Sequence, residues 1–242
     1  MRFALMSDIH LEFNNWTPPE LDVDLVVLAG DTHPGVKGVI WANEHFKQPV
    51  LMIAGNHEFY GRRSVNRHPM KMQAKAQELG GKVQVLHNQT MTVEGIKFIG
   101  ATLWTDYALL GNQPLSMMIA EQSMNDFRYA SYDLYSKLRG YHLVQEHSKS
   151  RDFIESEIGE NTVVITHHAP SEKCLQLNDR IVDNLSPAYA SNLNSLVAYG
   201  GAKVWCFGHT HHNVDFTLGN TRVVSNCRGY EPGPYQPLII EV

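Results

Sequence analysis

Short apolar runs, each with the length of a buried β-strand, recur along this chain of 242 residues. A short motif with polar side chains lies just past each of five of these runs. The five runs are Phe3–Met6, Leu25–Ala29, Val50–Ala54, Val163–Ile165 and Val204–Phe207. The early part of the chain alternates such runs with mixed segments of helical character, a pattern typical of α/β proteins.

Helices and hairpins fill the segments between these runs. Helices are predicted over Val36–Phe46, Ser64–Leu79, Tyr132–Ile158 (with a break at Gly140) and Pro187–Tyr199. Hairpins are predicted for Met91–Glu94 with Lys97–Gly100, and for Val214–Leu218 with Arg222–Ser225; Val83–Leu86 and Leu238–Val242 are further strands. A purely parallel sheet would not need hairpins, so we expect an α/β fold of two mixed sheets stacked face to face, with helices outside (αββα).

We expect one domain over residues 1–242, because the chain shows no repeat and no low-complexity tract. The segment 104–130 differs from the rest, since it contains several methionines and has no clear period. We interpret it as a helical insertion or lid near the site.

Composition and charge restrict the function classes. The net charge of −5 indicates no extended nucleic-acid-binding surface, although a local basic groove stays open. No signal peptide precedes the first strand and no apolar run could span a membrane. The three cysteines show no disulfide or CxxC spacing. These features favour a cytoplasmic protein without a membrane partner.

Polar motifs follow the five apolar runs, where α/β sheets place their sites. They read Asp8-Ile9-His10, Gly30-Asp31, Gly55-Asn56-His57-Glu58, Thr166-His167-His168 and Gly208-His209-Thr210-His211. Asp8 and His10, two residues apart, can share one metal ion. Asp31 can bridge two ions with its two oxygens. Taken alone, Asp8 and His10 are equally compatible with an ordinary turn after a strand, and for Asp31 alone such a turn is the better interpretation.

The later motifs are more specific. Asn56 offers an amide oxygen suited to hard or borderline metals, and His57 would lie beside the metals as a proton donor to the leaving group. We predict His167 as a ligand because it comes first after its strand, with His168 behind it. His209 and His211 can serve two adjacent ions.

Taken together, the five motifs predict a site for two metal ions. Imidazole, carboxylate and amide ligands without thiolate indicate Mn, Fe or Zn. Two metals bridged by a carboxylate indicate hydrolysis of a phosphate ester, with hydroxide between the metals as the nucleophile.

These residues resemble the calcineurin-like metallophosphoesterase superfamily, whose motifs are D-x-H, G-D, G-N-H-[DE], a lone His and G-H-x-H, in this order. The resemblance implies two stacked mixed sheets flanked by helices. It implies one metal on Asp8, His10 and His211, a second on Asn56, His167 and His209, Asp31 bridging both, and His57 near the leaving group. Segments 103–106, 124–128 and 226–230 are similar to an uncharacterised bacterial subgroup.

The chain departs from the family pattern at one position. Many members continue the Gly-Asp motif as GDxxD, whereas Pro34 stands here at the second Asp. His57 is therefore expected to lack its usual acidic partner. The absence of a following Arg-Gly also argues against a protein Ser/Thr phosphatase.

We expect a phosphodiesterase or phosphatase acting on a small-molecule or nucleotide phosphate ester. Arg228 is a candidate phosphate contact because guanidinium matches phosphate geometry, although a surface arginine is an equal alternative. Asn125 is a candidate substrate contact if the 104–130 segment folds over the site; otherwise it caps a helix. A nuclease of the same superfamily, or a scaffold without activity, are the competing interpretations.

Overall fold

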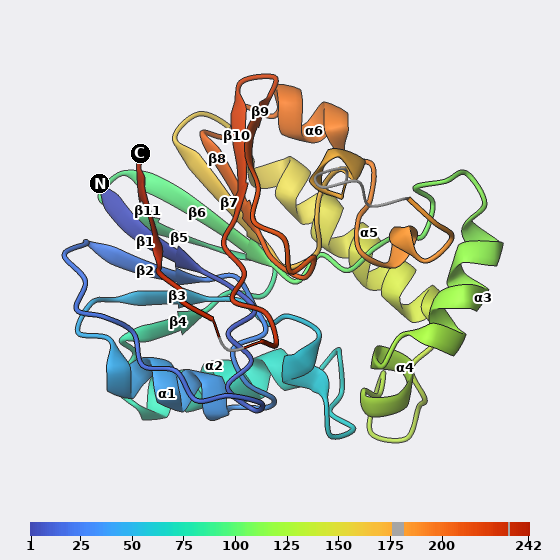
Figure 1. The fold of residues 1–242 in the computed structure, drawn as a ribbon, viewed down its shortest axis with the longest axis horizontal. Coiled ribbons are helices and arrows are strands. Elements are labelled where there is room, and N and C mark those ends of the chain that lie inside the picture. The colour runs from blue at the N-terminus through green and yellow to red at the C-terminus, as the bar shows by residue number, and fades with distance from the viewer. Residues whose placement is uncertain (176–181, 232) are drawn as a thin grey trace.

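The computed structural model describes residues 1–175, 182–231 and 233–242 and contains two mixed β-sheets packed face to face (Figure 1). The first sheet has the order β11 (Leu238–Glu241), β1 (Arg2–Met6), β2 (Leu25–Leu28), β3 (Val50–Met52), β4 (Val83–Val85). The second has the order β5 (Gln89–Val93), β6 (Ile96–Ala101), β7 (Thr162–Thr166), β8 (Val204–Phe207), β10 (Thr221–Ser225), β9 (Asp215–Leu218). The expected αββα class is confirmed.

Parallel strands form the centre of each sheet, and the antiparallel strands lie at the edges. Strands β1 to β4 run parallel, as do β6, β7, β8 and β10. Strand β11 adds to β1, β5 to β6, and β9 to β10, each antiparallel. Parallel central strands end at one edge of each sheet, so the residues that follow them gather there.

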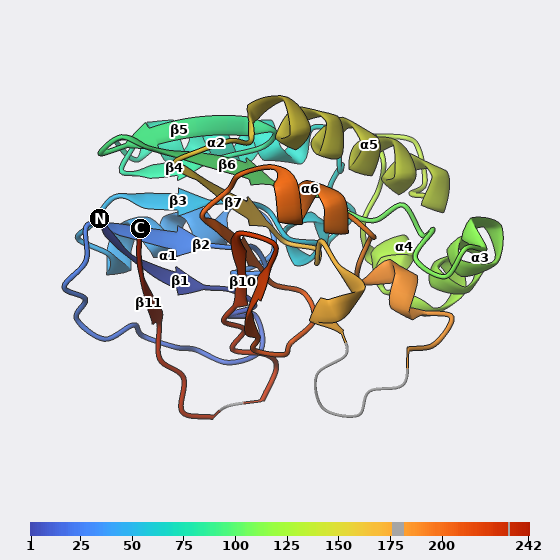
Figure 2. The same cartoon turned by 90° about the horizontal axis from the view of Figure 1, so that it is seen from above.

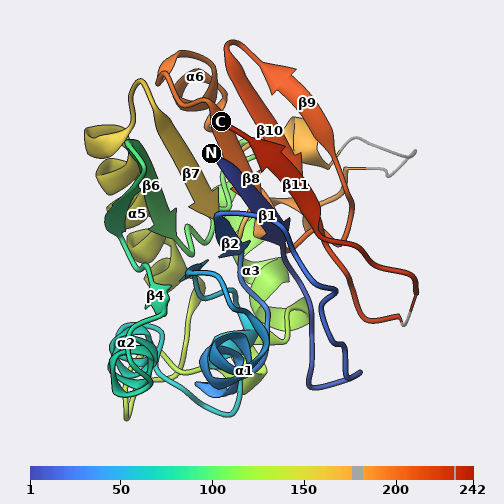
Figure 3. The same cartoon turned by 90° about the vertical axis from the view of Figure 1, so that its left-hand side faces the viewer.

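Helices cover the two outer faces. On the first sheet lie α1 (Lys37–His45) and α2 (His68–Glu78), and on the second lie α5 (Gly140–Glu157) and α6 (Asn194–Tyr199). Figure 3 shows both helix layers on opposite sides of the sandwich. The short helices α3 (Gln113–Ser123) and α4 (Asp126–Tyr129) extend from one end of the molecule (Figure 2). Three 3₁₀ turns, η1 to η3, cover His57–Phe59, Glu172–Cys174 and Ser186–Ala188.

The period of two along β1 divides its side chains between two cores. Phe3 and Leu5 lie between the sheets, whereas Ala4 and Met6 lie in the cluster packed beneath α1 and α2. Phe3 meets Phe98 of the second sheet edge to face, with ring centroids 5.8 Å apart. Aromatic pairs of this kind hold the two sheets at a fixed separation.

Two predicted helices are shorter than the sequence indicated. The first begins at Gly140, because Ser131 pairs as a β-bridge with both Ser64 and Lys137. The second is divided, because Ala190 forms a parallel bridge with Ala169 before α6 begins. In both places the prediction is wrong because backbone pairing with a distant segment replaces the local helical hydrogen bonds.

Two further expectations from the sequence concern the cysteines and membrane-spanning segments. Cys174, Cys206 and Cys227 are buried and unpaired with one another. Among the described residues, no helix combines the length and apolar content required to cross a bilayer.

Truncating the core between the sheets tests this packing. We expect Phe98→Ala to lower the free energy of unfolding by about 3–5 kcal/mol, because the ring is completely buried and leaves a cavity. Urea unfolding measures this change. Tyr199→Ala, at a position 86% exposed, is the control and should change it by less than about 0.5 kcal/mol. Equal effects of the two substitutions would contradict the described core.

Candidate metal centre

The predicted ligands gather where parallel strands of both sheets end. They follow β1 (Asp8), β2 (Asp31), β3 (Asn56), β7 (His167) and β8 (His209). A parallel bridge between Ser7 and Cys227 connects the two sheets at this edge. The fold therefore brings together residues far apart in the chain, such as His10 and His211, which are separated by 201 positions.

Asp8, His10 and His211 form a first cluster. Nε2 of His211 lies 3.3 Å from Oδ1 of Asp8 and 3.0 Å from Nε2 of His10. The ligand atoms of all three lie within 4.8 Å of one another. Asp8 and His10 are fully buried, and the side chain of His211 is 24% exposed.

Asp31, His167, His209 and Asn56 form a second cluster. Nε2 of His167 lies 3.4 Å from Oδ2 of Asp31 and 3.0 Å from Oδ1 of Asn56. Nδ1 of His167 lies 2.9 Å from the carbonyl oxygen of Ala29, which turns Nε2 towards the site. Nε2 of His209 is buried and has no hydrogen-bond partner among the described residues.

Asp31 lies between the two clusters. Its Oδ2 is 3.7 Å from Nε2 of His10 and 3.4 Å from Nε2 of His167. Its Oδ1 accepts the backbone N–H of His57 at 2.8 Å. One carboxylate thus faces ligands of both clusters, as a bridging ligand must.

The backbone around these ligands is strained. The residues Asp8, His10, Asp31, His209 and His211 all have φ between 49° and 67°. For residues other than glycine this left-handed conformation costs of order 1–3 kcal/mol each. Interactions elsewhere in the fold must compensate for this cost. The five residues have in common that their side chains turn into one site.

Two glycines permit the close approach of these strands. A Cβ atom on Gly55 would collide with Oδ1 of Asp31, and one on Gly208 would lie 2.5 Å from Oδ2 of Asp8. Glycine at these positions therefore leaves space for the ligand carboxylates, whatever its conformational freedom.

The pKa values of the titratable groups in the second cluster are strongly shifted. Burial lowers the pKa of His167, but Asp31 outweighs it and raises that pKa to about 10. Burial and the neighbouring His167 lower the pKa of His209 to about 3. Burial alone would raise the pKa of Asp31, yet His167 and His57 hold it well below its usual range. His209 is thus a neutral imidazole with an unused nitrogen, as metal binding requires.

These residues fit two metal ions. Each cluster combines carboxylate, imidazole or amide donors and includes no thiolate. The buried, unpartnered Nε2 of His209 has the donor atom that a metal would use. An unsatisfied polar atom of this kind otherwise costs free energy.

His57 lies beside the clusters and faces the same pocket. Its Nε2 is 3.9 Å from Oδ2 of Asp31 and 3.3 Å from the hydroxyl of Tyr230. Its Nδ1 lies 2.8 Å from Oε1 of Glu12. Burial lowers the pKa of His57, but Asp31 and Glu12 outweigh it and raise that pKa to about 9.

Asn56 is oriented by the 104–130 segment. Its Nδ2 donates to Oδ1 of Asp126 at 2.8 Å, and the hydroxyl of Tyr60 donates to the same oxygen at 2.8 Å. Asp126 lies on α4 and is buried, which raises its pKa. Because the amide nitrogen is held in this way, the amide oxygen of Asn56 turns towards His167.

Glu58, the last residue of the Gly-Asn-His-Glu motif, connects two ligand loops. Its carboxylate accepts backbone N–H groups of Asp31 at 3.0 Å, Thr32 at 2.8 Å and Gly55 at 2.7 Å. Burial and the charge of Asp31 raise its pKa to about 8.

The remaining predicted residues have different surroundings. Asn125 lines the pocket, and its side chain makes no capping hydrogen bond to α4. Nη1 of Arg228 donates to the carbonyls of Ile9 at 2.7 Å and Asn14 at 3.1 Å, and its contact with a phosphate stays a prediction. Nδ1 of His168 lies 3.2 Å from the carbonyl of Thr102.

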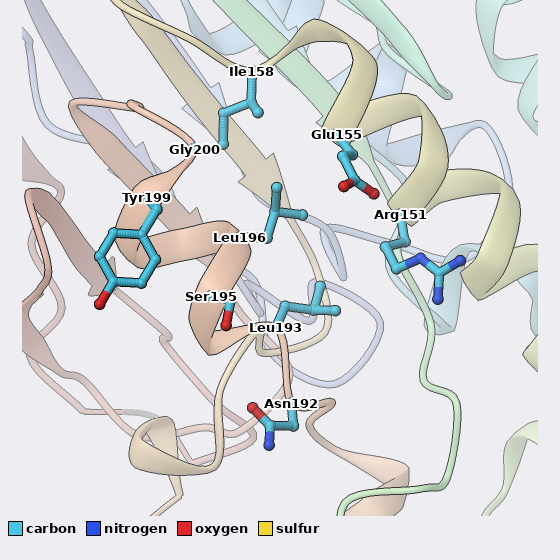
Figure 4. Close-up of a pocket in the computed structure, with 9 residues that line it drawn as sticks. All are labelled: Arg151, Glu155, Ile158, Asn192, Leu193, Ser195, Leu196, Tyr199 and Gly200. Atoms are coloured by element: carbon cyan, nitrogen blue, oxygen red, sulfur yellow. The ribbon is translucent and has the colours of Figure 1, made fainter.

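A pocket of about 270 Å³ opens over these ligands. Tyr60, Tyr189 and Tyr230 line it together with Asp31, Asn56, His57, His209 and His211. A larger cavity of about 590 Å³ lies between α5 and α6 and has none of the predicted site residues in its wall (Figure 4). Only the first of these cavities contacts the metal clusters.

The amino-acid sequence matches the family described as calcineurin-like phosphoesterase over residues 1–213. The chain belongs to this family. It is a metal-dependent phosphoesterase, as the motifs indicated, and family members use a dinuclear metal centre.

Individual similarities are more distant. An uncharacterized protein of Acanthamoeba polyphaga mimivirus is 23% identical over 201 residues, covering 75% of this chain and 68% of that protein. The phosphopantetheinyl hydrolase of Mycobacterium tuberculosis has a TM-score of 0.73 and 17% identity, covering 94% of this chain and 89% of the other. A putative 5′-nucleotidase from Staphylococcus aureus has a TM-score of 0.50 and 15% identity, with coverage of 94% and 49%. These structural likenesses concern the fold.

Sequence reasoning missed Glu12, a carboxylate beside His57 in this phosphoesterase site. Glu12, Tyr60 and Tyr230 lie next to His57, and Asp126 holds Asn56. The sequence does offer one signal for Glu12, because its carboxylate lies two positions after the Asp8-Ile9-His10 motif. Tyr60 and Tyr230 are candidates from the sequence for the pocket wall, and Asp126 is a candidate to reach the site or to cap a helix, but nothing in the sequence places Asp126 beside Asn56.

Removing the carboxylate of Asp126 tests how Asn56 is held. We expect Asp126→Ala to weaken metal binding about 10–100-fold, because the amide of Asn56 loses its orientation. Isothermal titration of metal-free protein with Mn²⁺ measures this affinity. Asp152→Ala is the matched control, since among the described residues Asp152 pairs with its neighbour Arg151 alone, and its side chain is 64% exposed. Unchanged affinity in Asp126→Ala would contradict the described role.

Metal uptake should release protons. With a pKa of about 10, His167 carries a proton at neutral pH in metal-free protein, and a metal must displace it. The apparent metal affinity is therefore expected to rise with pH up to about pH 10. Titrations in two buffers of different ionisation enthalpy measure the protons released. Identical heats in both buffers would show that His167 is already neutral.

Proposed function

We propose that this phosphoesterase hydrolyses a phosphodiester of a small molecule or nucleotide at a dinuclear metal centre. The observation that carries the proposal is the position of Asp31, whose Oδ2 lies 3.7 Å from Nε2 of His10 and 3.4 Å from Nε2 of His167. Asp8, His10 and His211 would hold one ion, and Asn56, His167 and His209 the other. Mn, Fe and Zn all suit these donors.

The metal ions and the side chains of the pocket would have different roles in the reaction. Bound metal ions would supply a nucleophile from water at neutral pH and positive charge against the phosphoryl oxygens. His57 holds a proton at Nε2, which faces the pocket, and gives it to the oxygen of the leaving group. Asn125 and Tyr230 line the space that the substrate would enter.

A diester is favoured over a monoester by the charge of the pocket. Among the described residues that line it, no lysine or arginine accompanies the metal ligands. A diester carries one negative charge and a monoester up to two, so the diester depends less on additional cations. Tyr60, Tyr189 and Leu185 offer a surface for the second ester substituent.

The names of the neighbours are compatible with this proposal. One is a phosphopantetheinyl hydrolase and another a putative 5′-nucleotidase, so related folds are associated with hydrolysis of small phosphate-bearing groups. The nuclease alternative needs a basic surface, and the net charge of −5 does not favour one. The segment 104–130 supports the pocket wall through Met124 and Asn125.

Turnover of two chromogenic esters tests the proposal. We expect metal-stripped protein to hydrolyse bis(p-nitrophenyl) phosphate after addition of Mn²⁺, and p-nitrophenyl phosphate more slowly. The Asn56→Ala, His209→Ala double variant should lose at least about 100-fold of this rate, because the second metal loses two donors.

His45→Ala is the matched control, since His45 is exposed on α1 and should leave the rate unchanged. Faster turnover of the monoester would contradict the diester preference. Absence of turnover on both esters in protein shown to contain metal would count against this substrate class.

A further inference from the structure

His57 has an acidic neighbour from a different part of the chain than the Gly-Asp motif. The sequence has Pro34 where many family members carry the second Asp of the Gly-Asp motif. Glu12, in the turn after β1, brings its Oε1 to 2.8 Å from Nδ1 of His57. The side chains are 16% and 7% exposed, so water competes little for this hydrogen bond.

The same oxygen of Glu12 also contacts a metal ligand. Oε1 lies 3.1 Å from Nδ1 of His10. Both imidazole rings therefore turn Nδ1 towards Glu12 and leave Nε2 for other partners. Nε2 of His10 lies 3.0 Å from Nε2 of His211, and Nε2 of His57 lies 3.3 Å from the hydroxyl of Tyr230.

The ring of His57 is restricted on both sides. Tyr60 stacks on it with a centroid distance of 4.2 Å and an interplanar angle of 30°. The ring of His10 contacts it edge-on at 4.4 Å. The plane of the ring is thus largely fixed, and what remains open is which of its edges faces the pocket. A hydrogen-bond acceptor at Nδ1 decides this orientation.

The turn that carries Glu12 is itself fastened at both ends. The backbone N–H of His10 donates to the carbonyl of Asp31 at 3.0 Å. On the other side, Nη1 of Arg228 donates to the carbonyls of Ile9 and Asn14, which flank the turn. The position of Glu12 relative to the two imidazole rings is therefore fixed by these backbone contacts.

We propose that Glu12 is the positioning residue for His57 and replaces the acidic partner that Pro34 cannot supply. The inference rests on the proposed function, because it concerns the proton that leaves Nε2. As the bond between phosphorus and the leaving oxygen breaks, that oxygen keeps the electron pair and takes the proton from Nε2. Water supplies the oxygen of the new bond to phosphorus. The neutral imidazole keeps its Nδ1–H on Glu12.

The dependence on the leaving group separates this role from a merely structural one. A proton donor matters for a basic leaving group and little for a good one. We expect Glu12→Ala to slow Mn²⁺-dependent hydrolysis of diphenyl phosphate about 10–100-fold, and that of bis(p-nitrophenyl) phosphate less than about 3-fold. Glu12→Gln keeps an oxygen acceptor for Nδ1–H and should recover part of the lost rate.

A double-mutant cycle tests whether Glu12 acts through His57. In a His57→Ala background, adding Glu12→Ala should slow diphenyl phosphate hydrolysis no further, because its partner is already absent. Equal loss on both esters, or full additivity of the two substitutions, would overturn the proposal and point to metal binding through His10. Glu20→Ala is the control on the same loop, since Glu20 is exposed and Lys47 is its one ion-pair partner within the described part of the chain.

A spectroscopic measurement on metal-free protein is independent of turnover. With ¹⁵N-labelled histidine, the Nδ1–H signal of His57, assigned by its loss in His57→Ala, should disappear in Glu12→Ala and persist in Glu20→Ala. Its persistence in Glu12→Ala would overturn the proposal. If the signal behaves as expected but wild-type protein hydrolyses neither ester, the proposed function fails, and the catalytic role of Glu12 fails with it, although the hydrogen bond is established.

Discussion

The buried carboxylate of Asp31 is the group on which the rest of this site depends. It is 1% exposed, and an ion removed from water in this way costs several kcal/mol unless it is compensated. Its compensation comes from His10, His57 and His167, all within 3.9 Å, and from the backbone N–H of His57. In the loaded enzyme, metal ions would take over this compensation. The same carboxylate raises the pKa of both His57 and His167.

The αββα sandwich can surround the Asp31 carboxylate with compensating groups because it brings the strand ends of both sheets to one edge. The first sheet supplies the carboxylates and the amide, whereas the second supplies His167, His209 and His211. Neither sheet holds a complete metal cluster alone. The core between the sheets, which includes the contact of Phe3 with Phe98, thus contributes to the site because it keeps the two sheets together.

Much of the fold and of the ligand set could be predicted from local sequence. Apolar runs followed by Asp, Asn or His mark strand ends without reference to any distant residue, and so Asp8, Asp31 and His209 could be identified directly. The helix boundaries near Ser131 and Ala190 could not, because a bridge to a distant strand-like segment decides them. Long-range pairing of this kind leaves no periodic signal in the sequence.

The residues that orient the ligands were harder to recognise for the same reason. Asp126 is 70 positions from Asn56, and Glu12 is 45 positions from His57. A carboxylate next to a helix start or in a turn looks like an ordinary surface group when only its neighbours in sequence are considered. For Arg228 the residue type alone suggested a contact with phosphate. In the structure its guanidinium contacts two backbone carbonyls, which the sequence does not indicate.

The number and position of metal ions in Mn²⁺-loaded crystals, located by anomalous scattering, test the central claim most directly. The account predicts two ions about 3.5–4 Å apart, with the carboxylate of Asp31 between them. It also predicts that both ions are lost or weakly occupied in Asp31→Asn. A single ion, or two ions that Asp31 does not bridge, would contradict the account.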